Sequence, residues 1–235
     1  MAVESGHECH LVCMAAQAIA EALTLEGDQA MSDDYSEGLT AYTEQYKRVC
    51  DALPYDAISR MVDILWEACL KGKAIYTMGN GGHCNTASHM INDLAKHTVS
   101  SDDKARVVAE KRRFRTMCLN DSMSFVTGIS NDMGYEHVFA EQLANWVEPG
   151  DVVIGISGSG NSANVLAAFA VAREKGARSI ALAGFKGGKA ALVADLCVTV
   201  PCDKMVMVED FHMMISHMVA DELKKLVQDR TELNG

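Results

Sequence analysis

Residues 151–162 read DVVIGISGSGNS, the most informative pattern in this 235-residue chain. The apolar run at 152–156 predicts a strand that is buried on both faces, as strands of parallel sheets are. Serines and glycines follow directly, and a helical pattern then runs from about residue 162 to residue 175. This order of strand, glycine-rich turn and helix places the turn at the carboxyl edge of a sheet, where open α/β proteins bind ligands.

The turn itself has the composition of an anion-binding loop. Ser157, Ser159 and Ser162 supply hydroxyl donors. The glycines allow close backbone approach, and the helix that follows offers free N–H groups at the positive end of its dipole. The sequence therefore predicts a phosphate-binding loop, and the alternative is an ordinary Ser/Gly turn with a helix cap at Asn161 or Ser162. The lysine of a nucleotide P-loop is missing, which argues against triphosphate hydrolysis.

Strands and helices alternate on both sides of this loop. The other expected strands are 73–78, 116–119, 179–183 and 196–200, and the other expected helices are 83–97, 122–130, 135–146 and 205–227. Such alternation implies a parallel sheet with right-handed crossover connections. We therefore expect an α/β domain with a five-stranded parallel sheet flanked by helices.

Residues 1–70 differ from the rest of the chain, because they show helical patterns and no strand. Helices are expected at about 8–25, 35–52 and 55–70. We expect an N-terminal helical segment over 1–70 and the α/β domain over 71–235, which together form one compact unit. A leading helical segment of this kind normally caps a sheet or makes an oligomer contact.

The composition limits the classes of partner. Hydrophobic residues make up 49% of the chain, which is enough for a sizeable core. Lysine and arginine number 21 against 32 acidic residues, a formal charge of −11, which argues against general nucleic-acid binding. An anionic ligand stays possible, because backbone N–H groups hold phosphate whatever the net charge.

The eight cysteines are scattered singly, and neither a signal peptide nor an apolar run of transmembrane length is evident. We therefore expect a cytoplasmic protein with free thiols and no membrane attachment. His7, Cys9, His10 and Cys13 form a small cluster. Metal binding there is the less favoured interpretation, since no second ligand pair at zinc-finger spacing follows. The alternative is an ordinary helical core pair.

Two further strands end in loops with polar residues. Residues 79–83 read GNGGH, in which Asn80 can contact a hydroxylated ligand and Gly81 and Gly82 open the backbone before His83. Residues 119–122 read LNDS, in which Asp121 can accept hydrogen bonds from ligand hydroxyls or can cap the next helix. Each loop is weak evidence by itself, because many tight turns have similar sequences.

Histidines and carboxylates on two expected helices suggest a metal site. His89 and Asp93 are four residues apart, so they lie on one helix face, displaced by only about 40° around the axis. Glu209 and His217 lie two turns apart on the C-terminal helix. If the two helices face each other, these four residues form an N/O site suited to zinc or a similar divalent ion. The alternative is two ordinary polar helix surfaces.

Taken together and in order, these motifs resemble the sugar isomerase (SIS) domain phosphosugar isomerases, and among them the phosphoheptose isomerases. The resemblance covers about residues 57–227. The matching segments are 79–82, 89–93, 120–122, 131–135 with Phe139, 149–152, 156–162, 187–188 and 208–217. It implies a flavodoxin-like sheet, a homotetramer with active sites at subunit interfaces, and aldose–ketose isomerisation of a phosphosugar such as sedoheptulose 7-phosphate.

The resemblance also implies roles for individual residues. The three loop serines and the 80–83 segment with Asp121 match substrate-binding positions, His89, Asp93, Glu209 and His217 match zinc-binding positions, and Asp93 and His217 match the catalytic base and acid. Three of these positions depart from the family pattern. Asp93 stands where the family has a glutamate, Glu209 where it has a glutamine, and His83 where it has a serine that helps to hold the phosphate.

These departures keep an alternative open: a non-catalytic SIS module that senses a phosphosugar or associates with a bacterial replication initiator. Retention of His89 and His217 favours the enzyme. A longer connection over 104–115 carries six basic residues, which form either a solvated loop or an electropositive rim that attracts a phosphorylated substrate.

Overall fold

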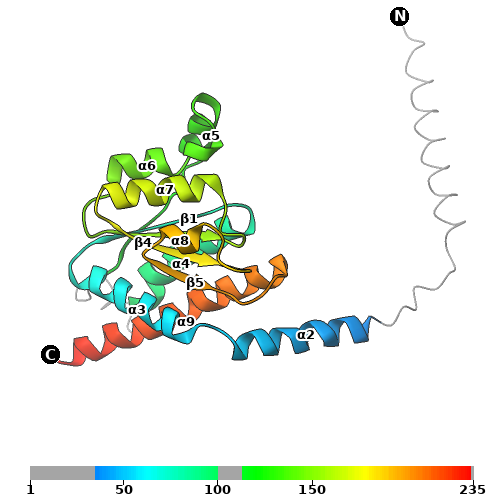
Figure 1. Ribbon diagram of the computed structural model, residues 1–235. Helices are drawn as coiled ribbons and strands as arrows, with labels where there is room; N and C mark the ends of the chain where they lie inside the picture. The colour runs from blue at the N-terminus through cyan, green and yellow to red at the C-terminus, as the bar shows by residue number, and fades with distance from the viewer. Residues whose placement is uncertain (1–34, 100–112, 234–235) are drawn as a thin grey trace, which may run out of the picture. The chain divides into compact units, whose positions relative to one another are not determined.

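The computed structural model describes residues 35–99 and 113–233 (Figure 1). The first expected helix, the His7–Cys13 cluster and most of the basic connection lie outside the described residues. A compact unit begins at Tyr46 and contains the whole sheet. The helix over 55–70 belongs to that unit, and the first strand begins shortly after it, at Ala74. The division of the chain at residue 71 stays a prediction.

The sheet has five parallel strands in the order β2-β1-β3-β4-β5. Their bounds are β1 (Ala74–Gly79), β2 (Arg115–Cys118), β3 (Val152–Ser157), β4 (Arg178–Ala183) and β5 (Leu196–Thr199). This is the flavodoxin-like order, in which ligands bind at the carboxyl edge beside the β1/β3 switch point. The expected five-stranded α/β architecture is confirmed, and Gly79 aligns with Ile156 so that two of the predicted loops leave the sheet side by side.

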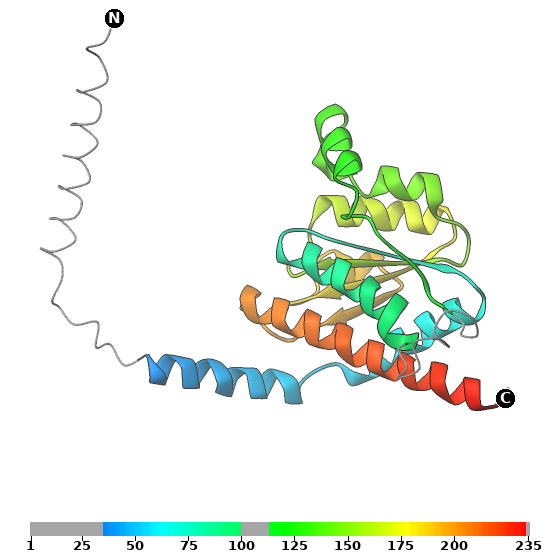
Figure 2. The same cartoon turned by 180° about the vertical axis from the view of Figure 1, so that it is seen from behind.

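Helices cover both faces of the sheet. The described helices are α2 (Ser36–Asp51), α3 (Tyr55–Leu70), α4 (Gly82–Lys96), α5 (Met123–Asp132), α6 (Ala140–Trp146), α7 (Ala163–Glu174), α8 (Ala190–Val193) and α9 (Met205–Leu233), with 3₁₀ turns η1 (His97–Val99) and η2 (Tyr135–His137). Helices α6 and α7 lie over one face, and α3, α4 and α9 lie over the other (Figures 1 and 2). The second layer matters most for the site, because α4 packs along α9 there.

The core explains why β3 occupies the centre of the sheet. Every residue of β3 is buried, as its apolar sequence predicts. A Cβ added at Gly155 would come within 2.6 Å of both Val165 and Phe169 on α7. The missing side chain therefore lets α7 lie close to β3, and this fixes the start of α7 directly over the serine loop.

The structure differs from the sequence-based expectation at two helices. The helix expected at 135–146 is interrupted between η2 and α6. Val138 lies in this interruption, and its carbonyl accepts a hydrogen bond from Gln142 Nε2 on α6 at 2.7 Å. Helix α8 was not expected, since four residues are too short to show a helical period. No helix in the described part of the chain is long and apolar enough to cross a membrane.

Candidate functional site

The serine loop joins β3 to α7 at the carboxyl edge of the sheet. The Oγ atoms of Ser157 and Ser162 lie 2.9 Å apart and share a hydrogen bond, and the Ser159 hydroxyl accepts from the N–H of Asn161 at 3.2 Å. Ser162 is the N-cap residue of α7, but its side chain makes no capping hydrogen bond. The Val165 N–H in the first turn of α7 donates to Asn164 Oδ1 at 3.0 Å, so one of the first N–H groups is bonded by a side chain. The loop hydroxyls lie at a helix N-terminus, which is where proteins commonly bind phosphate.

A second glycine-rich loop, residues 184–190, holds the serine loop in place. The Gly184 N–H donates to Gly158 O at 2.8 Å, and the Ala190 N–H donates to Gly160 O at 2.9 Å. Gly160 has φ +65°, and a Cβ there would lie 2.0 Å from the carbonyl oxygen of Gly187. Only glycine permits this approach, so the two loops form one rigid backbone unit.

The loop after β1 lies beside the serine loop and contributes the predicted contact residue Asn80. Asn80 and Asn164 exchange two amide hydrogen bonds of 2.9 Å, and the Tyr135 hydroxyl also donates to Asn80 Oδ1 at 2.8 Å. Gly81 and Gly82 are exposed at the start of α4. The sequence did not point to Asn164 or Tyr135 as partners of this loop, although a buried asparagine in an apolar helix was an available signal.

The loop after β2 lies at the same edge. The Asn120 side chain bonds both the N–H and the carbonyl of Gly79, at 3.1 and 2.9 Å, and thereby ties β2 to β1. Asp121 is exposed. Burial raises the pKa of the half-buried Cys84 thiol on α4, and the negative charge of Asp121 adds to that shift. The Asp121 carboxylate is therefore near enough to the first turn of α4 to affect the pKa of Cys84 there. The other predicted contact residues, Asn80 to His83, lie at the same turn.

His83 is buried at the start of α4, 6% exposed. A Cβ added at Gly158 would lie 3.1 Å from its Cε1 atom, so the imidazole lies against the serine loop. Burial lowers the pKa of His83, and the negative charge of Glu209 opposes that shift. The structure thus places the predicted residue His83 beside the serine loop, where burial favours the neutral ring.

Three of the four predicted metal ligands come together between α4 and α9. Asp93 Oδ2 lies 3.2 Å from His89 Nε2 and 3.7 Å from His217 Nε2, and the two Nε2 atoms are 3.0 Å apart. Ligand atoms about 2.1 Å from a tetrahedral zinc would be about 3.4 Å from one another. The spacing and the chemistry of these donors therefore fit a divalent ion, and the condition for the predicted site, that the two helices face each other, is met.

Glu209 is not part of this three-residue cluster. Its carboxylate lies against Gly82, where an added Cβ would be 2.7 Å from Oε2. Glu209 precedes His217 by eight residues, which is about 12 Å along a helix axis. Its role as a fourth ligand stays a prediction, because in this structure the side chain is directed at the start of α4.

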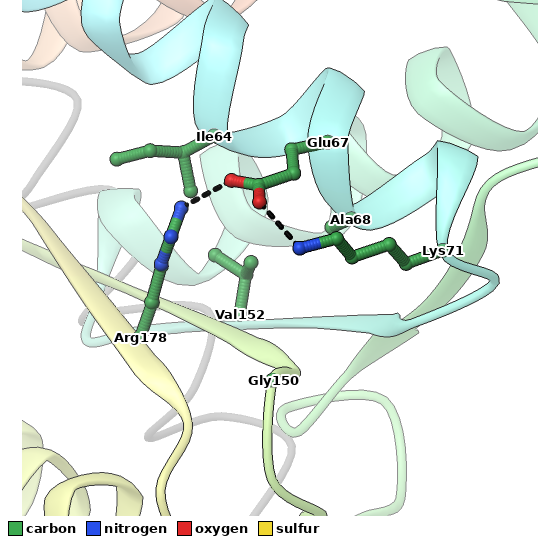
Figure 3. Close-up of a pocket in the computed structure, with 7 residues that line it drawn as sticks. All are labelled: Ile64, Glu67, Ala68, Lys71, Gly150, Val152 and Arg178. Carbon is green, nitrogen blue, oxygen red and sulfur yellow. Dashed lines mark hydrogen bonds and ion pairs between the residues drawn. The ribbon is translucent and has the colours of Figure 1, made fainter.

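A separate cavity of about 60 Å³ lies at the opposite, amino edge of the sheet, beside the first residues of β3 and β4 (Figure 3). There the Glu67 carboxylate bridges Lys71 and Arg178, and the two bonds lower the pKa of Glu67. The site residues follow the carboxyl ends of the strands instead. This cavity is therefore distinct from the candidate site.

Comparison with known proteins places the chain in a family. The SIS domain family matches residues 40–184. The phosphoheptose isomerase of Geotalea daltonii is 39% identical over 168 residues, which cover 72% of this chain and 83% of that protein. The phosphoheptose isomerase of Rhodospirillum rubrum is 32% identical over 189 residues, 80% of this chain and 95% of that protein.

A solved structure agrees with these sequence matches. The phosphoheptose isomerase of Neisseria gonorrhoeae superposes with a TM-score of 0.72 at 26% identity, and the match covers 81% of this chain and 98% of that one. The chain therefore belongs to the SIS domain family, and within it is related to the phosphoheptose isomerases.

Proposed function

We propose that this protein is an aldose–ketose isomerase for a sugar phosphate, with sedoheptulose 7-phosphate or a similar phosphosugar as substrate. The observation that carries the proposal is that α4 connects the two halves of the site. Its first turn places His83 against the serine loop, and His89 and Asp93 of the metal cluster follow on the same helix. His83 and His89 are about 9 Å apart along the helix axis, so one extended sugar phosphate can reach both ends.

The serine loop binds the phosphate in this proposal, and its rigidity positions the carbonyl end of the sugar. Ser157, Ser159 and Ser162 donate to the phosphate oxygens, while Asn80 and Asp121 contact sugar hydroxyls. Binding energy from the phosphate, which does not react, is then used to hold the reacting carbons in place. The names of the relatives, all phosphoheptose isomerases, favour a seven-carbon substrate.

Asp93 and His217 perform the proton transfers in this proposal. Asp93 removes a proton from the carbon beside the carbonyl, the electron pair forms the C=C bond of a cis-enediol, and His217 protonates the carbonyl oxygen. The hydroxyl on the first carbon then gives its proton back to His217 as the new C=O bond forms, and Asp93 returns its proton to the former carbonyl carbon. Asp93 Oδ2 faces both imidazoles, which leaves the other carboxylate oxygen for the substrate proton. A zinc or similar ion held by His89, Asp93 and His217 would polarise the carbonyl.

A homotetramer in the cytoplasm completes the proposal. The side chains of His89 and His217 are 44% and 53% exposed in a single chain. Groups that bind metal and substrate are normally more enclosed, since exclusion of water strengthens electrostatic catalysis. A second copy of the chain that covers this surface would supply the enclosure.

The variant Asp93→Asn tests the proposed function. We expect loss of turnover of sedoheptulose 7-phosphate, because an amide cannot accept the carbon-bound proton, together with retained binding of the phosphosugar. Turnover, calorimetric affinity and zinc content are measured for the wild type, for Asp93→Asn and for the control Asp63→Asn, an exposed position on α3. An active Asp93→Asn enzyme would contradict the assignment.

The position of Glu209 supports a second candidate, a non-catalytic phosphosugar-binding regulator. With Glu209 directed at Gly82, only three protein ligands remain in the cluster. Metal analysis of the purified protein separates the two candidates. Stoichiometric zinc with turnover supports the isomerase, whereas phosphosugar binding without metal and without turnover supports the regulator.

A further inference from the structure

A chain of hydrogen bonds runs from the first turn of α7 to the hydroxyl of Tyr135. It begins at the main-chain N–H of Val165, which donates to Asn164 Oδ1 at 3.0 Å. Asn164 and Asn80 exchange two amide bonds of 2.9 Å, and the Tyr135 hydroxyl donates to Asn80 Oδ1 at 2.8 Å. Three segments that are far apart in the sequence, α7, the loop after β1 and η2, are thereby joined.

The direction of every bond in this chain is determined by its first member. A main-chain N–H can only donate, so the Asn164 atom that meets it must be the amide oxygen. The Asn164 amide nitrogen must then donate to Asn80, and the atom that it meets must be the Asn80 oxygen. That oxygen cannot donate, so the Tyr135 hydroxyl must give its proton to it. The orientation of both amides therefore follows from the network.

This direction decides what Asn80 can offer a ligand. Its Oδ1 accepts from both Asn164 and Tyr135, which occupies both lone pairs of the oxygen. One N–H donates to Asn164, and no described residue accepts from the other. Because Asn80 is only partly buried, this second N–H is available to a ligand. Asn80 can therefore donate to a ligand oxygen, but its own oxygen cannot accept from a ligand.

Tyr135 holds its side of the Asn80 amide from a firm support. It opens η2, and Val138 and Phe139, which follow η2, are completely buried in the core. Gly134, directly before Tyr135, has φ +102°, which residues other than glycine rarely adopt, and this turn directs the chain into η2. The Tyr135 side chain is 49% exposed, so packing alone does not require a tyrosine here. Its hydroxyl bond to Asn80 is the contact that distinguishes it from a phenylalanine.

We propose that Tyr135 is a positioning residue for substrate binding, which acts through Asn80 by holding the amide with its free N–H available to an oxygen of the sugar phosphate. The inference rests on the proposed function, in which Asn80 contacts the sugar. An amide bonded on both sides cannot turn to present its oxygen, so the contact selects an acceptor atom. Hydroxyl and carbonyl oxygens of a phosphosugar meet that requirement, whereas an ammonium group does not, because it has donors only.

The variant Tyr135→Phe keeps the ring, removes the hydroxyl and tests this role in the full-length protein. We expect the affinity for sedoheptulose 7-phosphate, measured by calorimetry, to fall roughly fivefold, as for one hydrogen bond lost. KM should rise by a similar factor while kcat changes less than about twofold, since the Asn80 contact holds ground state and transition state alike.

The matched control is Tyr55→Phe. Tyr55 is 48% exposed, and its hydroxyl donates to the Cys50 carbonyl at 3.0 Å, so the same atom and one comparable bond are removed. Tyr55 lies at the start of α3 and touches none of the predicted site residues through that bond. This variant should bind and convert the phosphosugar as the wild type does.

A double-mutant cycle distinguishes positioning from a direct contact between Tyr135 and the substrate. Asn80→Ala removes the amide through which Tyr135 acts, and Asn80→Ser takes its place if the alanine variant does not fold. Affinity is measured for the wild type, both single variants and the double variant. Without the amide, Tyr135→Phe should have no further effect on affinity.

Unchanged affinity in Tyr135→Phe, or an equal loss in Tyr55→Phe, contradicts the inference. An equal effect of Tyr135→Phe with and without the Asn80 amide also overturns it, since the phenol would then act on the substrate by itself. Both outcomes leave the proposed function intact as long as the wild type converts the phosphosugar. A wild-type protein that neither binds nor converts sedoheptulose 7-phosphate contradicts the proposed function and the inference together.

Discussion

At the scale of single residues, Gly160 shows how closely the phosphate site depends on backbone packing. A side chain there would combine a positive φ of 65° with a Cβ only 2.0 Å from the Gly187 carbonyl. We expect Gly160→Ala to lower the free energy of unfolding by at least about 2 kcal/mol. Phosphate affinity should fall too, because the two loops must separate.

The matched control is Gly128→Ala on α5, where an added Cβ meets nothing within 4 Å. That variant should be more stable by about 0.5–1 kcal/mol, since alanine has the higher helix propensity. Urea unfolding of both variants measures the difference. Equal effects of the two substitutions would show that the loops are not packed as described.

His212 of α9, which is completely buried, predicts how stability depends on pH. Burial lowers its pKa to about 3 in the folded protein, from about 6.5 in an unfolded chain. Between these values the unfolded state binds a proton that the folded state does not. The free energy of unfolding contributed by this residue therefore falls as the pH falls from 6.5 toward 3, by up to about 1.4 kcal/mol per pH unit.

Urea unfolding at pH 7 and at pH 5.5 measures this effect. Other groups titrate in the same range, so the wild type is compared with His212→Leu at each pH. Lowering the pH should destabilise the wild type by about 1 kcal/mol more than the variant. Parallel losses in the two proteins would mean that His212 is accessible to protons in the folded state.

The sequence predicted residues that the structure brings together, but not the contacts between them. His83, His89, Asp93 and His217 were predicted from spacing, from their position after strands and from the family resemblance, and the last three form a cluster that could hold a metal ion. The direction of the Glu209 side chain and the contact between the His83 and His212 rings depend on how α9 is rotated against α4, which helical spacing does not determine.

At the scale of elements, the Asn80–Asn164 pair connects the end of β1 to the first turn of α7. The reciprocal pattern needs both a donor and an acceptor on each side chain. In Asn164→Asp the donors are lost, and a carboxylate replaces an amide that is only 3% exposed. We expect a loss of about 3 kcal/mol in the free energy of unfolding, together with weaker phosphosugar binding.

The control for this prediction is Asn85→Asp, an exposed position on α4. Its effect on the free energy of unfolding should stay within about 0.5 kcal/mol. Urea unfolding and calorimetry on the two variants provide the comparison. A wild-type-like Asn164→Asp protein would show that the amide pair does not link these elements.

Elements with strong periodicity were predicted well, and short ones were not. The strand β3 and the helix α3 appear where the apolar patterns placed them, because burial on both faces or on one face leaves a clear signal. Helix α8 and the division between η2 and α6 depend on hydrogen bonds to other parts of the fold. Gln142, for example, donates to the carbonyls of Leu119 and Val138.

At the scale of the whole molecule, the strand order brings the chemistry to one edge. The loops after β1, β2 and β3 leave adjacent strands in the same direction, and α4 and α9 carry the His89–Asp93–His217 cluster. The opposite edge carries the Glu67 ion pairs and none of the predicted site residues. The predicted site residues and the Glu67 ion pairs therefore lie at opposite edges of the sheet.

The central claim is that this edge isomerises a phosphosugar through an enediol. The most direct test incubates the zinc-loaded protein with sedoheptulose 7-phosphate in D₂O and follows the reaction by NMR. The account predicts an aldose heptose 7-phosphate that carries deuterium at C2, because the base exchanges its proton with solvent before returning it to carbon. Tight binding of the ketose with no aldose and no deuterium at C1 or C2 would contradict it.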